Sequence, residues 1–287
     1  MASDFHPANR GVAAHWDGAT TRAWADAHEL IDRRFVALTR SLFAAAAPKS
    51  GERALDIGCG AGTTLLVLAR AVAPGGRAVG LDISARQCAV ADARIAAESV
   101  GGASTLVADL SIHDFGATRF DLAFSRFGVM FFADPVAAFA KLRAAMAPGG
   151  RLCFGVFRAA DLNPWATRMG DAVRDLVAPP PPSSSPPGTG QFSWADPARV
   201  RTILGDAGWH DVSLDPLDVA IPIVGPEGID EALDFALNFS PLARAMASAP
   251  LESKVPVVAA MRAWLDGVKR ERGGALPAAL WIVRARR

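Results

Sequence analysis

Residues 53 to about 158 alternate between short apolar runs and stretches with helical periodicity. The apolar runs are RALDI, RAVGL, STLVA, DLAFS and RLCFGVF. They are largely continuous rather than alternating with polar residues, as expected for strands that are covered on both faces. Strands and helices that take turns in this way predict an α/β fold with a parallel sheet and helices on both of its faces.

Helical periodicity also precedes this region. Residues 11–47 carry apolar side chains at helical spacing, with Trp24, Leu30 and Phe35 among them, and Pro48 closes the segment. The pattern predicts one long helical segment before the sheet.

Turn signals mark where several elements begin and end. Pro-Gly-Gly occurs at 74–76 and again at 148–150, each time directly before a predicted strand. Asp134-Pro135 and Asp196-Pro197 each predict a helix N-cap followed by proline at the first helical position. PPPPSSSPP, at 179–187, predicts an exposed loop, because it can join neither a helix nor a central strand.

The last part of the chain adds two strands and a helical insertion. Apolar runs at 209–221 and 279–286 predict the strands, and residues 226–272 between them are mainly helical in pattern. We expect the insertion to lie at one end of the sheet as a cover. The predicted division is an N-terminal helical lid over 1–50, a sheet core over 51–225 and 279–287, and an acceptor-site cover over 226–278.

The stretch LDIGCGAGT, residues 55–63, places a glycine-rich turn between the first strand and the next helix. Gly58, Gly60 and Gly62, with Cys59 among them, allow the backbone to approach a ligand closely. The exposed N-terminus of the following helix favours an anionic group. The turn therefore predicts a nucleotide-type site.

The spacing within this turn distinguishes between nucleotides. A dinucleotide site usually shows GxGxxG, whereas here position 63 is threonine and the third glycine falls one position early. The strand ends in Asp56, whose carboxylate would repel a pyrophosphate but suits a cationic ligand. S-adenosylmethionine meets both requirements, because it offers an ammonium and a sulfonium to the acid and a carboxylate to the helix N-terminus.

Two more acids end the next two strands. Asp82 is placed to accept hydrogen bonds from both ribose hydroxyls. Asp109, in LVADL, is placed to accept from the adenine amino group, with Ile83 and Leu110 flanking the ring. A single Asp is more often a helix cap or a solvated loop residue. Three acids at consecutive strand ends, beside a glycine turn, outline one ligand.

The order and spacing of these motifs resemble the core of class I S-adenosylmethionine-dependent methyltransferases. The resemblance is carried by LDIGCGAG, VGLDIS, VADL, DLAFSRFGVMFFADP and LRAAMAPGGRL. SRFGVMFFADP followed by PGGRL is similar to the small-molecule branch related to ubiquinone and menaquinone biosynthesis, and AAHWDGATTRAW resembles that branch more weakly. The family implies a Rossmann-like, mostly parallel sheet of seven strands with an antiparallel last strand.

Methyl transfer from a sulfonium depends chiefly on alignment and on exclusion of water. A base is needed when the attacking atom must lose a proton, and histidine suits that role near neutral pH. His15 and His28 lie in the N-terminal segment, which in this family covers the donor site. Both are therefore candidate bases, and a surface or purely structural histidine is the alternative for each.

The residues after the fourth strand are candidates for contact with the methionine end of the donor and with the acceptor. Related enzymes bring the positions of Ser125 and Arg126 close to both. Arg126 could hold an acidic acceptor through its guanidinium fork, or it could pair with Asp134 or another acid at the rim.

Aromatic side chains near this point predict either an apolar acceptor pocket or ordinary core packing. For Trp16, a lid over the ligand is the functional interpretation, and core packing with Trp24 is the alternative. The other residues concerned are Phe127, Met130, Phe131 and Phe132.

Charge and missing motifs argue against several function classes. Thirty Lys and Arg against twenty-nine Asp and Glu leave a net charge of +1, whereas a protein that binds nucleic acid is expected to be more basic. No Pro-Cys pair, no proline-proline-aromatic tetrapeptide after the fourth strand and no metal-ligand pattern occur in the sequence. There is also no tyrosine to act as an acid or base. A small molecule is therefore the expected partner.

The sequence also bears on location. It has no apolar run long enough to span a membrane, and no secretion signal is expected. Its three cysteines lack CxxC spacing and are expected to be reduced thiols, as in the cytoplasm. The sequence leaves the oligomeric state open.

Two other functions stay open at this point. An oxidoreductase could bind NAD through the same turn, although the glycine spacing argues against it. A module that binds S-adenosylmethionine without transferring its methyl group would need the same donor site.

Overall fold

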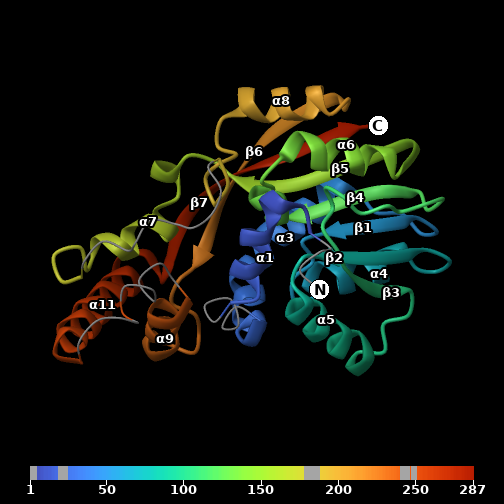
Figure 1. The fold of residues 1–287 in the computed structure, drawn as a ribbon. Coiled ribbons are helices and arrows are strands. Elements are labelled where there is room, and N and C mark those ends of the chain that lie inside the picture. The colour runs from blue at the N-terminus through green and yellow to red at the C-terminus, as the bar shows by residue number, and fades with distance from the viewer. Residues whose placement is uncertain (1–4, 19–24, 178–187, 240–245, 247–250) are drawn as a thin grey trace.

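The central sheet has seven strands in the order β3-β2-β1-β4-β5-β7-β6 (Figure 1). The computed structural model describes residues 5–18, 25–177, 188–239, 246 and 251–287. Neighbours from β3 to β5 pair in parallel, and β7 runs antiparallel to both β5 and β6. The predicted fold class, with its antiparallel last strand, is therefore confirmed. The strands are β1 (Arg53–Ile57), β2 (Arg77–Asp82), β3 (Ala103–Val107), β4 (Phe120–Arg126), β5 (Met146–Phe157), β6 (His210–Pro222) and β7 (Ala275–Arg286).

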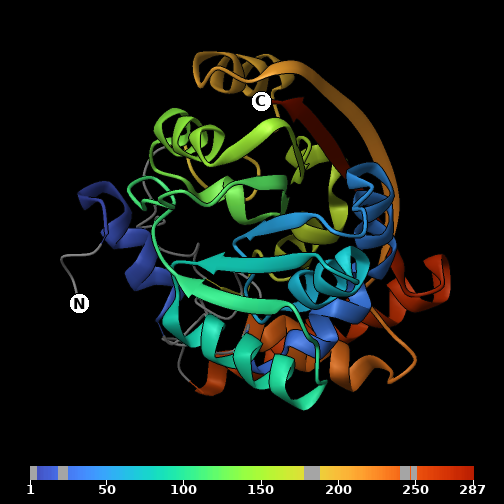
Figure 2. The same ribbon diagram turned by 90° about the vertical axis from the view of Figure 1, so that its right-hand side faces the viewer.

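Helices cover both faces of the sheet, as the alternating pattern predicted. Figure 2 shows α4 and α6 on opposite sides of the strands. Right-handed crossovers produce this arrangement because the strand order runs in opposite directions from β1 and from β4. The helices are α1 (Arg10–Trp16), α3 (His28–Ala46), α4 (Thr63–Val72), α5 (Ala85–Ala97), α6 (Pro135–Ala144), α7 (Pro164–Asp171), α8 (Pro197–Asp206), α9 (Ile229–Phe239) and α11 (Leu251–Arg272), with 3-10 turns η1 (Pro7–Asn9), η2 (Gly128–Phe131) and η3 (Ala160–Leu162).

The hydrophobic core includes the contact between α3 and the middle of the sheet. Leu42 of α3, Phe124 of β4 and Phe154 of β5 are completely buried there. The ring of Phe43 lies 4.7 Å from that of Phe124. This packing fixes α3, and with it the polar residues on the first turns of the helix, relative to the strand ends.

Both predicted Asp-Pro helix starts are confirmed. The Asp134 carboxylate accepts the main-chain N–H of Ala137 at 2.9 Å, and α6 begins at Pro135. Asp196 caps α8 in the same way, with Pro197 as the first helical residue.

The second Pro-Gly-Gly differs from its prediction. It lies within β5 rather than directly before it, because the strand already starts at Met146. Phe120 pairs with Met146, but Leu122 pairs with Arg151, so the longer path on β5 forms an irregularity in the ladder. The glycines accommodate this irregularity, and Gly149 has a φ of +75°.

Residues 11–47 were predicted to be helical, and the described part of this segment is interrupted. The helix α1 ends at Trp16, where Asp17 and Gly18 turn away from the helix axis, and α3 begins at His28. The hydroxyl of Ser84 donates a hydrogen bond of 2.6 Å to Asp17, which ties this turn to the end of β2. Trp24 and the predicted loop PPPPSSSPP lie outside the described residues.

The two predicted late strands are confirmed as β6 and β7, and the insertion between them contains α9 and α11. These helices gather with α7 at one end of the molecule, at the left in Figure 1. The insertion contacts α3 through a salt bridge of 2.9 Å between Arg33 and Glu231. The guanidinium of Arg34 also lies 4.0 Å from the centre of the Phe235 ring. The late helices therefore meet the N-terminal helix that borders the strand ends.

Candidate active site

The glycine-rich turn after β1 has a left-handed backbone at three positions, with φ of +67°, +54° and +88° at Gly58, Gly60 and Gly62. A Cβ at Gly58 would lie 2.6 Å from the Cα of Gly128, and one at Gly62 would lie 2.8 Å from the Cβ of Ala91. At Gly60 the nearest such atom, in a side chain, is 3.9 Å away. Gly58 and Gly62 therefore serve close packing, whereas Gly60 faces open space.

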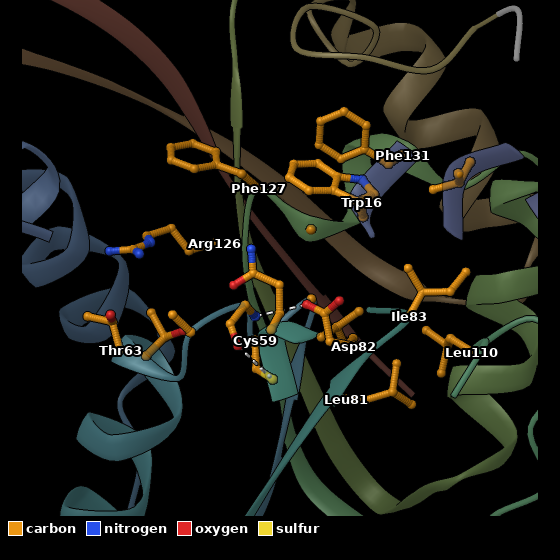
Figure 3. A pocket seen from close by; sticks show the side chains of 18 of the residues that line it. Trp16, Cys59, Thr63, Leu81, Asp82, Ile83, Leu110, Arg126, Phe127 and Phe131 are labelled. Carbon is orange, nitrogen blue, oxygen red and sulfur yellow. Dashed lines mark hydrogen bonds between the residues drawn. The ribbon is translucent and has the colours of Figure 1, made fainter. Parts of the chain in front are cut away.

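That open space is a cavity of about 210 Å³ at the carboxyl ends of the parallel strands. Open α/β sheets bind their ligands at this edge. Figure 3 shows side chains from the strand ends on one side of the cavity and Trp16 of α1 on another. Of the predicted donor-site residues, Gly58, Cys59, Gly60, Asp82, Ile83, Asp109 and Leu110 line the cavity, whereas Asp56, Gly62 and Ser125 lie behind its wall.

Main-chain donors hold Asp82 at the end of β2. One carboxylate oxygen accepts the N–H of Gly60 at 2.8 Å, and the other accepts the N–H of Ser84 at 2.9 Å. Each oxygen keeps lone-pair capacity for a ligand. Burial raises the pKa of Asp82, and the backbone hydrogen bonds oppose that shift. Ile83 and Leu110 form an apolar pair beside it (Figure 3).

Asp56 is completely buried behind Thr64. The Thr64 hydroxyl donates a hydrogen bond of 2.6 Å to Oδ2, and Oδ1 has no hydrogen-bond partner among the described residues. Burial raises the pKa of Asp56 to about 7. Thr64, rather than Asp56, stands at the cavity wall.

The N-terminal segment occupies the carboxylate of Asp109. Asn9 donates to both oxygens at 2.9 Å, and the main-chain N–H of His6 donates to Oδ2 at 3.0 Å. Ser111 donates to Oδ1 from its N–H and its hydroxyl. Asp109 therefore anchors η1 over this end of the cavity, and its contact with an adenine ring stays a prediction.

A charged cluster lies at the other end of the cavity. Arg126 donates to Oδ1 of Asp32 at 3.3 Å and to the hydroxyl of Thr39 at 3.0 Å. The hydroxyl of Thr63 donates to Oδ2 of Asp32, and Nη1 of Arg94 lies 3.5 Å from the same oxygen. These side chains come from α3, α4, α5 and the end of β4.

Arg126 thus pairs with an acid, as one interpretation of the sequence proposed. The partner is Asp32, and the suggested pairing with Asp134 is wrong. The Asp134 carboxylate instead accepts the N–H of Ala137 and caps α6.

The two candidate bases occupy different positions. His28 lines the cavity, and its Nδ1 lies 2.9 Å from the carbonyl oxygen of Ala25. A carbonyl can only accept, so Nδ1 carries the proton, and Nε2 of the neutral ring has a lone pair. His15 lies outside the cavity lining, with its ring against the edge of Trp16.

Aromatic side chains form the wall above the glycine turn in Figure 3. Trp16 and Phe131 pack edge to face, with ring centres 5.0 Å apart. Phe127 stacks on Phe157 at 4.4 Å, so one face of its ring is held by the core. Phe127, Phe131 and Phe132 line the cavity, whereas Met130 is buried behind it.

The sequence interpretation missed several lining residues. Gln87 is buried, and its Oε1 has no hydrogen-bond partner among the described residues. Ser84 and Gln87 have the spacing of a capping box, which was a usable signal. Here Ser84 accepts the N–H of Gln87, but the Ser84 N–H is already bonded to Asp82. Asn9 and Asp32 gave no local signal, because their partners are distant in sequence.

The described residues contain no group of three or more His, Cys, Asp or Glu side chains arranged to hold a metal ion. They also include no helix that combines the length and the apolar character needed to cross a bilayer.

Comparison with known proteins agrees with this geometry. Residues 54–150 match the model of the family described as a methyltransferase domain. The chain is 30% identical over 186 residues to nocamycin O-methyltransferase of Saccharothrix syringae, covering 62% of this chain and 66% of that protein. It is 35% identical over 127 residues to aklanonic acid methyltransferase of a Streptomyces species, covering 44% and 58%.

The menaquinone-related branch is represented too. Demethylmenaquinone methyltransferase of Geobacillus kaustophilus is 28% identical over 102 residues, which cover 36% of this chain and 44% of that protein. The matches thus span less than two thirds of the length of each of these curated relatives.

A solved structure extends the likeness in fold to nearly the whole chain. Phosphoethanolamine N-methyltransferase 2 of Haemonchus contortus, in complex with phosphomonomethylethanolamine and S-adenosylhomocysteine, superposes with a TM-score of 0.57 at 17% identity. The superposition covers 99% of this chain and 60% of that one. The fold and the strand-end site define a Rossmann-like methyltransferase domain. The resemblance to class I methyltransferases of the small-molecule branch is confirmed, with residues 54–150 as the matched domain.

Proposed function

We propose that the chain transfers a methyl group from S-adenosylmethionine to a small-molecule acceptor. One observation carries the proposal: a single cavity runs from an apolar slot beside Asp82, across Gly60, to a charged cluster at Asp32. An adenosine joined to an amino acid has its apolar, hydroxyl and charged groups in that order. The S-adenosylmethionine complex of the Haemonchus contortus enzyme and the names of the curated relatives support the same reaction.

Different residues of the cavity are proposed to bind different parts of the donor. When bound, S-adenosylmethionine supplies a methyl group already activated by the sulfonium charge. Asp82 would accept hydrogen bonds from ribose hydroxyls, and Ile83 and Leu110 would flank the base. Gly60 leaves room because it has no side chain. The empty acceptor capacity of Gln87 suits a hydroxyl donor at the same end.

The aromatic wall is the proposed acceptor side. Trp16, Phe127 and Phe131 present ring surface to the cavity and exclude water from it. His28 is the proposed general base, because it lines the cavity and its hydrogen bond through Nδ1 leaves Nε2 able to take a proton from an attacking hydroxyl. The name nocamycin O-methyltransferase supports an oxygen acceptor. We also propose that the helical insertion covers the acceptor site indirectly, by holding α3 against the cavity.

Location and partners complete the proposal. All three cysteines are free thiols, which suits a reducing compartment such as the cytoplasm. The cavity and the near-neutral charge favour a small molecule as the partner over a nucleic acid.

Calorimetry with S-adenosylhomocysteine tests the donor assignment. We expect saturable binding to one site, and no binding at millimolar ligand would contradict the proposal. NADH fluorescence is the parallel test for the oxidoreductase alternative, and enhancement that competes with S-adenosylhomocysteine would favour that alternative. Binding without turnover over a broad panel of phenols, carboxylates, amines and quinols would instead support a non-catalytic module.

A further inference from the structure

The charged cluster at the closed end of the cavity contains an ion pair that a ligand can reach. Arg126 and Asp32 are both cavity-lining residues, and their side chains are 13% and 18% exposed. Their 3.3 Å contact is supported by hydrogen bonds of Arg126 to Thr39 and of Thr63 to Asp32, which offset part of the cost of removing the charges from water. The guanidinium of Arg126 also lies 5.9 Å from the centre of the Phe35 ring. Both charged groups stand at the cavity wall, where a ligand can reach them.

The charges around this pair are unequal. Arg126 and Arg94 both approach the one carboxylate of Asp32, and Thr63 adds a hydroxyl donor. The second acid near Arg94 is Glu98, which is 39% exposed and also pairs with Arg70. The cluster thus has spare donor capacity for an anion, and α4 begins at Thr63 with its N-terminus facing the same point.

The first acid of the glycine motif does not supply the complementary negative charge at the wall. Asp56 is fully buried, and Thr64 lies between its carboxyl group and the cavity. Among the described lining residues at this end, Asp32 is the carboxylate with direct access. Asp82 and Asp109 belong to the other end, with Ile83 and Leu110.

We propose that Asp32 and Arg126 together form the receptor for the amino-acid group of the donor, with Asp32 binding the α-ammonium and Arg126 the α-carboxylate. This inference rests on the proposed function. An ion pair between two side chains is the complement of a zwitterion, because each charge can exchange its protein partner for the matching ligand charge. Figure 3 shows Arg126 and Thr63 on the side of the cavity away from Ile83 and Leu110. A donor with its adenosine beside Asp82 would extend its amino-acid group towards them.

The proposal gives the N-terminal helix a direct part in donor recognition. Asp32 belongs to α3, whereas Arg126 ends β4. The residue after Asp32, Arg33, forms salt bridges with Glu227 and Glu231 ahead of and within α9. A ligand that lacks the amino-acid group cannot use the α3 contact.

The test compares three ligands by calorimetry: S-adenosylhomocysteine, its analogue without the α-amino group, and methylthioadenosine, which lacks the whole amino-acid group. For Asp32→Asn we expect roughly ten- to a hundredfold weaker binding of S-adenosylhomocysteine. Binding of methylthioadenosine should stay within about twofold of wild type, and the analogue without the amino group should bind equally well or more tightly. Arg126→Gln should weaken both carboxylate-bearing ligands and spare methylthioadenosine.

Asp82→Asn is the matched control, because it removes a charge at the ribose end and should weaken all three ligands alike. Methylthioadenosine binding also reports that each variant is folded. Equal losses for all three ligands in Asp32→Asn, or no loss for any, would overturn the inference. Failure of wild-type protein to bind S-adenosylhomocysteine would instead overturn the proposed function, so the two failures are distinguishable.

Discussion

The two sides of the cavity differ in how the sequence encodes them. On the sheet side, the lining residues directly follow β1, β2, β3 and β4, and all lie within the matched domain at 54–150. On the helix side, Asn9, Trp16, His28 and Asp32 come from η1, α1 and α3, outside that domain. The sheet side is built by local turns at one sheet edge. The helix side depends on contacts between residues about a hundred positions apart, such as Asn9 with Asp109.

This difference suggests a division of labour. Under the proposals above, the sheet side holds the nucleoside of the donor and contributes Arg126 to its amino-acid group, while the helix side contributes Asp32 to that group and Trp16 and His28 to the acceptor.

Gly60→Val should abolish donor binding, with at least a hundredfold loss of affinity for S-adenosylhomocysteine. The new side chain would enter the open space above the turn and would also strain a backbone with φ of +54°. Gly51→Val is the matched control, because Gly51 also has a positive φ, of +85°, a Cβ there would meet nothing within 4 Å, and the residue precedes β1 outside the cavity lining. Calorimetry should show normal binding in the control, and normal binding in Gly60→Val would refute the sheet-side assignment.

His28→Gln should lower kcat by roughly a hundredfold or more, because it removes the proposed general base. Affinity for S-adenosylhomocysteine should stay within about threefold, since His28 belongs to the helix side. His15→Gln is the control and should leave kcat nearly unchanged. If both variants turn over like wild type, alignment alone drives the reaction and no base is used.

Asp82→Asn should weaken S-adenosylhomocysteine binding by about 1 to 3 kcal/mol, because it removes charge-assisted hydrogen bonds to the ribose. Calorimetry measures the change, and thermal unfolding checks that the turn at Gly60 survives. Asp92→Asn provides a control, since Asp92 is an exposed residue of α5 away from the cavity. An unchanged dissociation constant in Asp82→Asn would remove Asp82 from the site.

Asp56 should make the free energy of unfolding fall as pH rises. Its pKa is about 7 in the folded protein, above the ordinary value of 3.8, so between these values the folded state holds a proton that the unfolded state has released. Stability is therefore lost as the pH rises from about 4 through the folded pKa, and about 1.4 kcal/mol of that loss falls between about pH 6 and pH 8. Urea unfolding of Asp56→Asn at the same pH values should show a slope shallower by that amount. An identical slope would mean that Asp56 ionises normally.

Asp134→Ala should cost about 1 kcal/mol of stability through loss of the α6 N-cap. Donor binding should not change, because the partner of Arg126 is Asp32. A loss of affinity in this variant would reinstate Asp134 as part of the site.

The fold could be predicted well because its signals are local. Continuous apolar runs, Asp-Pro starts and the glycine turn each act within a few residues, and all belong to the sheet core. The break after Trp16 was missed because the helical periodicity continues past Asp17. A hydrogen bond from Ser84 holds that turn, and no local sequence pattern predicts this bond.

The residues of the candidate site likewise divide into those that local sequence signals predict and those that only the tertiary fold brings together. Asp82, Ile83 and Leu110 were predicted at the cavity because they directly follow strands. Asp32 was missed because its partners, Thr63 and Arg126, are supplied by the tertiary fold. Asp56 was expected at the cavity wall, yet its side chain lies behind Thr64. The spacing of a motif does not determine the direction in which a side chain at a strand end points.

The contact between Gly58 and Gly128 joins the loop that cradles the donor to the loop that carries Phe127 and Phe131. Main chain lies against main chain there, so a side chain at either position would push the two loops apart. Alignment across the reaction path then depends on a junction with no side chains to exchange. A change in size at Phe127 or Phe131 would therefore reshape the aromatic wall without altering the junction beneath it.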